Sequence, residues 1–135
     1  IVRGMPAENG GTYDLDEVWE TLSTQKSAFD GLWKLQAREA AESDCFNFTE
    51  MKLIGGGHFI FFQGFDCKDS SVQHFGFGSM RVEESGRVTE TGMTSTIDGY
   101  SGVDHQVGMR LIDADHMTQV FMLDGIEVVQ SYVRV

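Results

Sequence analysis

Five polar side chains lie in apolar stretches of the C-terminal half, and they are the first candidates for chemistry: Gln106, Arg110, Gln119, Gln130 and Tyr132. If strands turn these positions inward, they form a few convergent polar groups in an apolar cup. That is the usual composition of a small-molecule pocket. Arg110 is then the natural anchor for a carboxylate or an enolate. The alternative is a surface arginine paired with a neighbouring acid, because arginine is rarely buried without a partner.

Phenylalanines supply the apolar part of this predicted site. Phe75 and Phe77 alternate with glycines, so in a strand they share one face. Phe62 belongs to a phenylalanine cluster that follows Gly57. We expect Phe62, Phe75 and Phe77 to line the pocket, and packing in the core is the alternative interpretation.

The sequence offers little support for catalytic or metal chemistry. It lacks the Gly-x-Ser-x-Gly nucleophile elbow, and its four histidines match no metal-binding spacing. The segments around Gly56 and Gly78 do not open a helix, as a phosphate-binding loop requires. We therefore expect no catalytic residues, no metal and no cofactor; His58 and His105 are the acid–base candidates that remain.

Short β-type segments separated by Gly, Asp and Ser must position these residues. Connections as short as Ala114-Asp115 join antiparallel neighbours. Eight sequential antiparallel strands predict a mainly β, up-and-down barrel, whose closure removes both exposed edges. An interior of this size is either filled or holds one small ligand. The predicted strands are Leu32–Arg38, Glu50–Ile54, His58–Gln63, Val72–Glu83, Arg87–Thr96, Gln106–Asp113, His116–Leu123 and Glu127–Arg134.

An N-terminal helix precedes the predicted barrel. Leu15, Val18, Trp19 and Leu22 recur at helical spacing, and Asp14 can cap the first turn. We expect a flexible lead-in over residues 1–12, then one domain over 13–135 that includes a helix over 15–25. The apolar face of this helix either covers an end of the barrel or forms a dimer contact.

The order of several motifs resembles the lipocalin-like domain proteins of bacteria, which belong to the wider calycin group. Gly31-Leu32-Trp33 resembles the Gly-x-Trp opening of those barrels, and Tyr132-Val133-Arg134-Val135 resembles their aromatic-x-Arg-Val ending. The resemblance covers Phe29 to Val135, with Tyr132 where that group usually has Trp. It implies the barrel fold, with Arg134 packed across the Trp33 indole to close one end, but it implies no single activity. A guanidinium over an indole gains about 0.5–2 kcal/mol, which supports a structural role in barrel closure for both residues.

Charge and cysteine content limit the partners. A formal net charge of −11 argues against binding nucleic acid or an anionic membrane surface. Cys45 and Cys67 match no zinc or redox motif, so we expect two free thiols in a cytoplasmic protein, with a disulfide between two loops as the alternative. Residues 1–11 lack a signal peptide's apolar core, although a signal removed before residue 1 would fit export equally well.

These observations favour a binding protein for a small apolar or amphipathic molecule held inside the barrel. One alternative is an interaction or oligomerisation module, including a homodimer. The other is a cofactor-free isomerase or cyclase that uses the same cavity. Fold alone does not choose among them.

Overall fold

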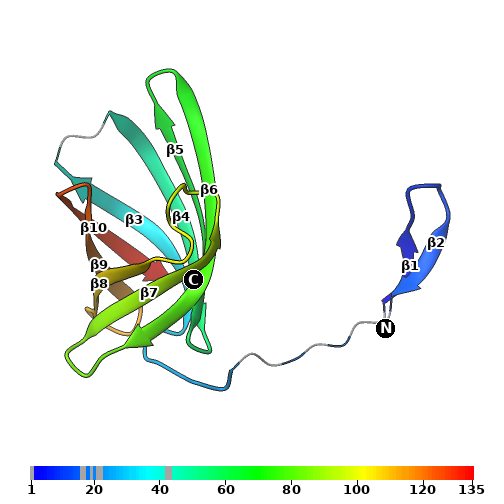
Figure 1. The fold of residues 1–135 in the computed structure, drawn as a ribbon, viewed down its shortest axis with the longest axis horizontal. Coiled ribbons are helices and arrows are strands. Elements are labelled where there is room, and N and C mark those ends of the chain that lie inside the picture. The colour runs from blue at the N-terminus through cyan, green and yellow to red at the C-terminus, as the bar shows by residue number, and fades with distance from the viewer. Residues whose placement is uncertain (1, 16–17, 19, 21–22, 42–43) are drawn as a thin grey trace.

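The computed structural model describes residues 2–15, 18, 20, 23–41 and 44–135, and nearly all of its regular structure is β-strand. Eight long strands follow one another from residue 31 to residue 134 (Figure 1). A shorter pair precedes them. The strands are β1 (Val2–Pro6), β2 (Thr12–Leu15), β3 (Gly31–Ala40), β4 (Cys45–Gly55), β5 (His58–Cys67), β6 (Ser70–Val82), β7 (Arg87–Ser95), β8 (Asp104–Leu111), β9 (His116–Leu123) and β10 (Ile126–Arg134).

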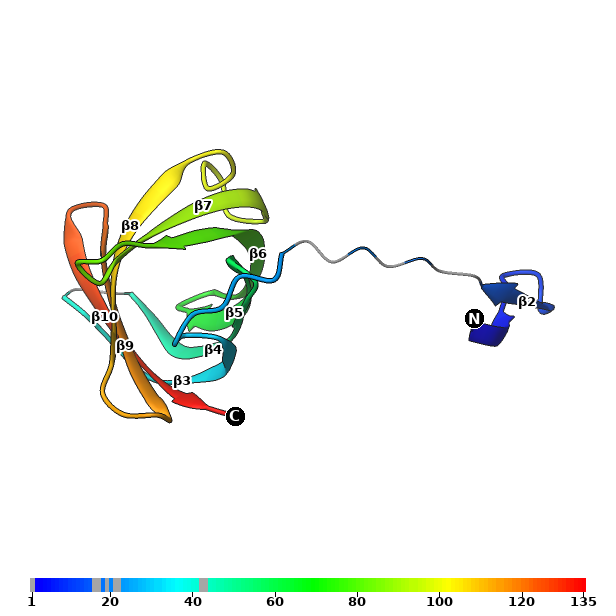
Figure 2. The ribbon, with the colours of Figure 1, turned by 90° about the horizontal axis from the view of Figure 1, so that it is seen from below.

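Strands β3 to β10 form one closed barrel in which every strand pairs with its neighbours in sequence. All eight pairings are antiparallel, and β10 closes the ring by pairing with β3. Figure 2 shows the ring of strands around its interior. The predicted mainly β, eight-stranded up-and-down barrel is therefore confirmed.

The N-terminal segment differs from the expectation. Strands β1 and β2 pair as an antiparallel hairpin where we expected a flexible lead-in. The predicted helix over 15–25 is not confirmed, because Leu15 ends β2 and the described residues after it show no helix. Trp19 lies outside the described residues. Among the residues that the structure describes, no helix has the length and apolar character needed to cross a membrane.

One end of the barrel is closed by Trp33, which is completely buried. The Arg134 guanidinium carbon lies 4.2 Å from the centre of the indole. The Trp33 Nε1–H donates to the Phe29 carbonyl at 2.8 Å, and Arg134 donates to the carbonyls of Asp30 and Ala114. These contacts tie the first and last barrel strands to the residues that directly precede β3 and to the turn between β8 and β9.

The opposite end is splayed between β3 and β4. Their ladder runs only from the pair Gly31–Ile54 to the pair Lys34–Met51, although β3 continues to Ala40. A disulfide between Cys45 and Cys67 joins β4 to β5 at this end. The expectation of two free thiols is wrong, and the bond links facing positions of two paired strands rather than two loops. We call this the open end and the Trp33 end the closed end.

Candidate functional site

The barrel interior contains a row of hydrogen-bonded polar side chains, which we call the interior polar chain. Gln119 donates to Gln130 Oε1 at 3.2 Å, and Gln130 donates to Glu50 Oε2 at 3.3 Å. All of its members are buried, so each needs the partners that the others supply. Its members come from strands β4, β7, β9 and β10: Glu50, Lys52, Glu90, Gln119, Gln130 and Tyr132.

Lys52 and Glu90 form a buried ion pair at one end of this chain. Their side chains are only 2% and 6% exposed. The Lys52 ammonium also donates to Gln119 Oε1 at 2.9 Å and lies 5.1 Å from the centre of the Phe59 ring. Burial makes two opposite charges mutually dependent, because removal of one leaves the other desolvated and unpaired.

Glu50 and Tyr132 form the acid end of the chain. The Tyr132 hydroxyl lies 3.0 Å from Glu50 Oε1 and 3.0 Å from Gln130 Oε1. Burial raises the pKa of the Glu50 carboxyl, and the nearby Lys52 ammonium partly opposes that rise. Burial, followed by the Glu50 charge, raises the pKa of Tyr132 well above its ordinary value. This arrangement favours a Glu50 that holds its proton to higher pH than an exposed glutamate does.

Arg38 connects the chain to the open end. It faces inward because β3 contains a bulge at Gln36: Ser131 pairs with Ala37, whereas Tyr132 pairs with Leu35. The bulge reverses the alternation after Gln36. Ala37 is therefore exposed, although in a regular strand it would face inward like Trp33. Arg38 lies 4.5 Å from the Phe48 ring centre and 6.0 Å from that of Phe121. Burial lowers its pKa, while Glu50 and Tyr132 act in the opposite direction.

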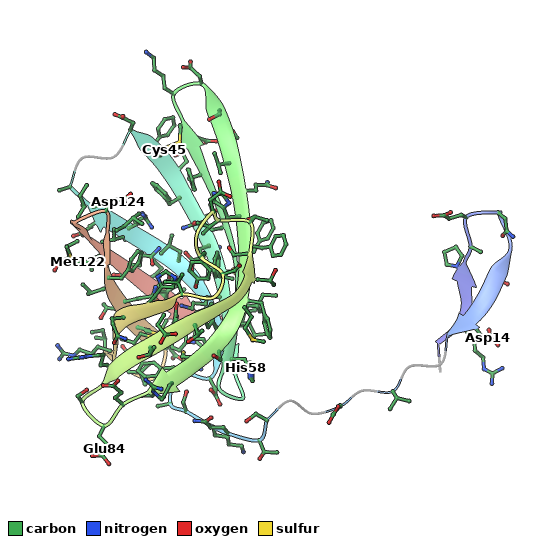
Figure 3. The ribbon with its side chains drawn as sticks, in the orientation of Figure 1. Asp14, Cys45, His58, Glu84, Met122 and Asp124 are labelled. Carbon is green, nitrogen blue, oxygen red and sulfur yellow. A yellow bond between two sulfur atoms is a disulfide. The ribbon has the colours of Figure 1, made fainter. Side chains whose placement is uncertain are left out.

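A hollow of about 390 Å³ lies at the splay between β3 and β4. Among the described residues that line it, Arg38 carries the formal charge and the others are apolar or neutral. These are Gln36, Ala37, Ala40, Cys45, Phe46, Asn47 and Phe48. The labelled Cys45 marks this end in Figure 3, opposite His58 at the other end. The hollow therefore combines an aromatic surface with one guanidinium.

The loop between β7 and β8 places a phenol ring against the interior. The Tyr100 ring stacks on His105 with centres 4.6 Å apart and meets the edge of Phe61 at 5.8 Å. Burial, followed by the charge of Glu90, raises the pKa of Tyr100. Within the described part of the chain, His105 Nε2 is buried without a hydrogen-bond partner. Tyr100 thus covers the part of the interior that lies beside Glu90.

Three of the eight predicted binding residues come together in the interior: Gln119, Gln130 and Tyr132. The other five lie elsewhere. Gln106 and Arg110 are exposed, and Gln106 bonds to Thr89 rather than to the interior chain. Phe62 and Phe75 are 55% and 47% exposed. Phe77 stacks on His58 with ring centres 5.8 Å apart.

Glycines in β6 explain why its phenylalanines face outward. Gly76 and Gly78 are buried, and a Cβ at either position would overlap the inward ring of Phe61 or Phe59. The rings of β5 therefore occupy space that β6 must leave free. With the glycines turned inward, alternation turns Phe75 and Phe77 to the outside.

The sequence analysis missed Arg38, Glu50, Lys52 and Glu90. A signal for Lys52 exists once the strand register is known, because Lys52 pairs with the inward Trp33. Glu50 then shares that face two positions away. Alternation alone could not reveal this, since Met51 and Leu53 make the opposite face equally apolar.

The arrangement can hold a proton between Glu50 and Tyr132. Among the described residues, no three His, Cys, Asp or Glu side chains are grouped so that they could hold a metal ion. The absence of a metal and of a cofactor stays a prediction.

The closed, eight-stranded, antiparallel barrel fits the calycin-like class of folds. No protein-family model matches the chain, and no curated protein matches it either. The class therefore rests on the barrel itself.

Proposed function

We propose that the open end of the barrel binds a small amphipathic molecule that carries a carboxylate. The observation behind this proposal is Arg38, an inward guanidinium held against Phe48 at the edge of a hollow of about 390 Å³. A guanidinium fork matches the two oxygens of a carboxylate, and the rings offer surface to an apolar body. Arg38 takes the place of Arg110 in the binding hypothesis.

The binding mode leaves the closed half of the interior intact. Trp33, Phe59 and Tyr132 are at most 1% exposed, so their space is already filled. An eight-stranded barrel has room for either its own side chains or one small ligand. We place the apolar part of the ligand against Phe48 and Phe121, and its carboxylate at Arg38.

The test is titration of the protein with decanoate, followed by displacement of anilinonaphthalene sulfonate fluorescence and by native mass spectrometry. Arg38→Met keeps much of the apolar stem but removes the charge, and we expect it to weaken decanoate binding about tenfold or more. Arg110→Met removes an exposed arginine and is the matched control. Lack of saturable binding to the wild-type protein, or equal affinity in both variants, would refute the proposal.

A cofactor-free isomerase or cyclase is the second candidate, and the hydrogen bond from Tyr132 to Glu50 at 3.0 Å favours it. A carboxyl group with a raised pKa keeps its proton to higher pH than an exposed glutamate does and can serve as a proton donor. If a bound carboxylate probe exchanges its α-hydrogen with deuterated water, Glu50→Gln should abolish that exchange without abolishing binding. Exchange that survives in Glu50→Gln would exclude this role.

Resemblance of the motifs supports assignment to the lipocalin-like proteins of bacteria. We propose this assignment on Trp33 and Arg134 at the closed end. The Cys45–Cys67 bond favours an oxidising compartment over the predicted cytoplasmic location, because such bonds persist where thiols are not kept reduced. Mass measurement of the protein alkylated without reductant, directly after extraction from its native cells, would test the location.

A further inference from the structure

The outer surface of β4, β5 and β6 carries a continuous apolar face. Strand register places Leu53 beside Ile60, Ile60 beside Phe77, and Phe62 beside Phe75. Leu53, Ile60, Phe62 and Phe75 are 50%, 46%, 55% and 47% exposed. Figure 3 shows aromatic side chains that project outward from the green strands. We call these five residues the β4–β6 face.

The sequence of β6 is compatible with Phe75 and Phe77 facing inward, but in the barrel both rings face outward. Gly76 and Gly78 occupy the inward positions beneath Phe61 and Phe59. Phe75 and Phe77 therefore do not contribute to the interior: Phe75 is 47% exposed, and Phe77 packs on His58 outside the barrel. Each half-exposed large side chain leaves on the order of 100 Å² in water, so Leu53, Ile60, Phe62 and Phe75 together leave about 400 Å². An apolar patch of this size is comparable to the largest patch on a typical soluble monomer, and such patches are often functional.

Charge distinguishes this face from the chain as a whole. The chain carries 21 Asp and Glu residues and a formal net charge of −11. Among the outward positions of the paired parts of β4, β5 and β6, the acid is Asp66, which lies near the Cys67 end of β5 and outside the five residues of this face. The other outward positions from Thr49 to Gly55, from His58 to Gly64 and from Gln73 to Arg81 are Thr49, Met51, Leu53, Gly55, His58, Ile60, Phe62, Gly64, Gln73, Phe75, Phe77, Ser79 and Arg81.

We propose that a second copy of this chain packs on the β4–β6 face, sheet against sheet, to form a symmetric dimer. Two strongly acidic molecules can approach closely only through surfaces that bring no carboxylates together, and this face meets that requirement on both copies. A two-fold interface uses the same patch twice, so it needs no other partner surface. A stable interface buries roughly 800 Å² per partner, so the dimer must bury the rim around this face as well as the face itself.

The experiment measures mass across a concentration series by light scattering and sedimentation equilibrium. We expect a dimer whose dissociation constant falls as salt rises from about 0.01 to about 0.15 M, because the Debye length shortens from about 30 to about 8 Å and screens the repulsion. Phe62→Glu and Phe75→Glu should each raise the dissociation constant at least tenfold. Met122→Glu is the matched control, since Met122 is 62% exposed and lies on the other side of the barrel, in β9 (Figure 3).

Circular dichroism and thermal unfolding check that each variant is folded, and Phe62→Ser gives a neutral second test at the same position. A wild-type protein that stays monomeric over the whole series would overturn the proposal. So would a dimer that Met122→Glu weakens as much as Phe62→Glu does. Decanoate binding to the Phe62→Glu monomer is measured in a separate experiment. The proposed dimer interface and the Arg38 site use different residues, so the failure of one proposal is distinguishable from the failure of the other.

Discussion

The two ends of the barrel interior are built from different interactions. At the closed end the Trp33 indole is completely buried, and the Arg134 guanidinium covers it. Toward the open end, the interior polar chain leads from the Lys52–Glu90 pair to Glu50, whose charge acts on Arg38 at the splayed wall. The closed end is held by a buried ring, a cation over it and hydrogen bonds to main-chain carbonyls, whereas the interior beyond it is held by hydrogen bonds between buried side chains.

This difference indicates which end of the barrel suits the proposed ligand site. An apolar plug tolerates no new polar group, whereas a polar chain that ends beside a hollow can extend its hydrogen bonds to a molecule that enters. The disulfide at Cys45 and Cys67 holds β4 and β5 together at the end where β3 and β4 separate. At the open end, a gap in the β3–β4 ladder thus lies beside two strands that a disulfide holds together.

Breaking the ion pair should produce the largest loss of stability. Lys52→Met leaves Glu90 buried without its cation, and we expect the free energy of unfolding to fall by about 3–5 kcal/mol. Urea denaturation followed by circular dichroism measures the change. Lys34→Met, on the exposed side of β3, should change it by less than about 0.5 kcal/mol.

A double variant sharpens this result. Lys52→Met with Glu90→Leu removes both charges, so it should recover at least half of the stability that Lys52→Met loses. A double variant as unstable as the single one would show that the pair contributes through packing alone.

Repeated β-type segments and short turns allowed the eight strands and their antiparallel order to be predicted from the sequence. The facing of the strands could not be predicted in the same way. In β6, an alternation of Phe and Gly fits either orientation, and only the rings of β5 decide that the glycines face inward. A buried glycine is the better choice because it leaves room for Phe59 and Phe61.

The candidate site was predicted only where polar residues alternate with apolar ones on β9 and β10. Gln119, Gln130 and Tyr132 follow that pattern and do face inward. Arg38 was missed because the bulge at Gln36 reverses the alternation, and a bulge leaves no clear mark in this sequence. Lys52 and Glu90 were missed because charged residues usually lie on the surface unless they are paired, and pairing over 38 positions requires the fold.

Loss of the closing arginine should have an intermediate effect. Arg134→Ala removes the cation over Trp33 and the hydrogen bonds to the Asp30 and Ala114 carbonyls. We expect the free energy of unfolding to fall by about 2 kcal/mol, measured by urea denaturation. Arg110→Ala is the control, because Arg110 is exposed on β8. Equal losses in both variants would contradict a closing role for Arg134.

The smallest effect should be a change in the pH dependence of stability, and it comes from Glu50. Burial raises the pKa of Glu50 in the folded protein, so between the unfolded and folded pKa values the native state binds more protons than the unfolded chain. The stability that Glu50 contributes is therefore complete below the unfolded pKa, near pH 4, and is lost as pH rises through the folded pKa.

Glu50→Gln cannot ionise, so its unfolding free energy should fall less than that of the wild-type protein as pH rises above about 4. Urea denaturation at a series of pH values measures the two slopes, with the exposed Glu127→Gln as control. Identical slopes for wild type and Glu50→Gln would place the ionisation outside the interior polar chain, and the contrast between the two ends would then rest on the Lys52–Glu90 pair alone.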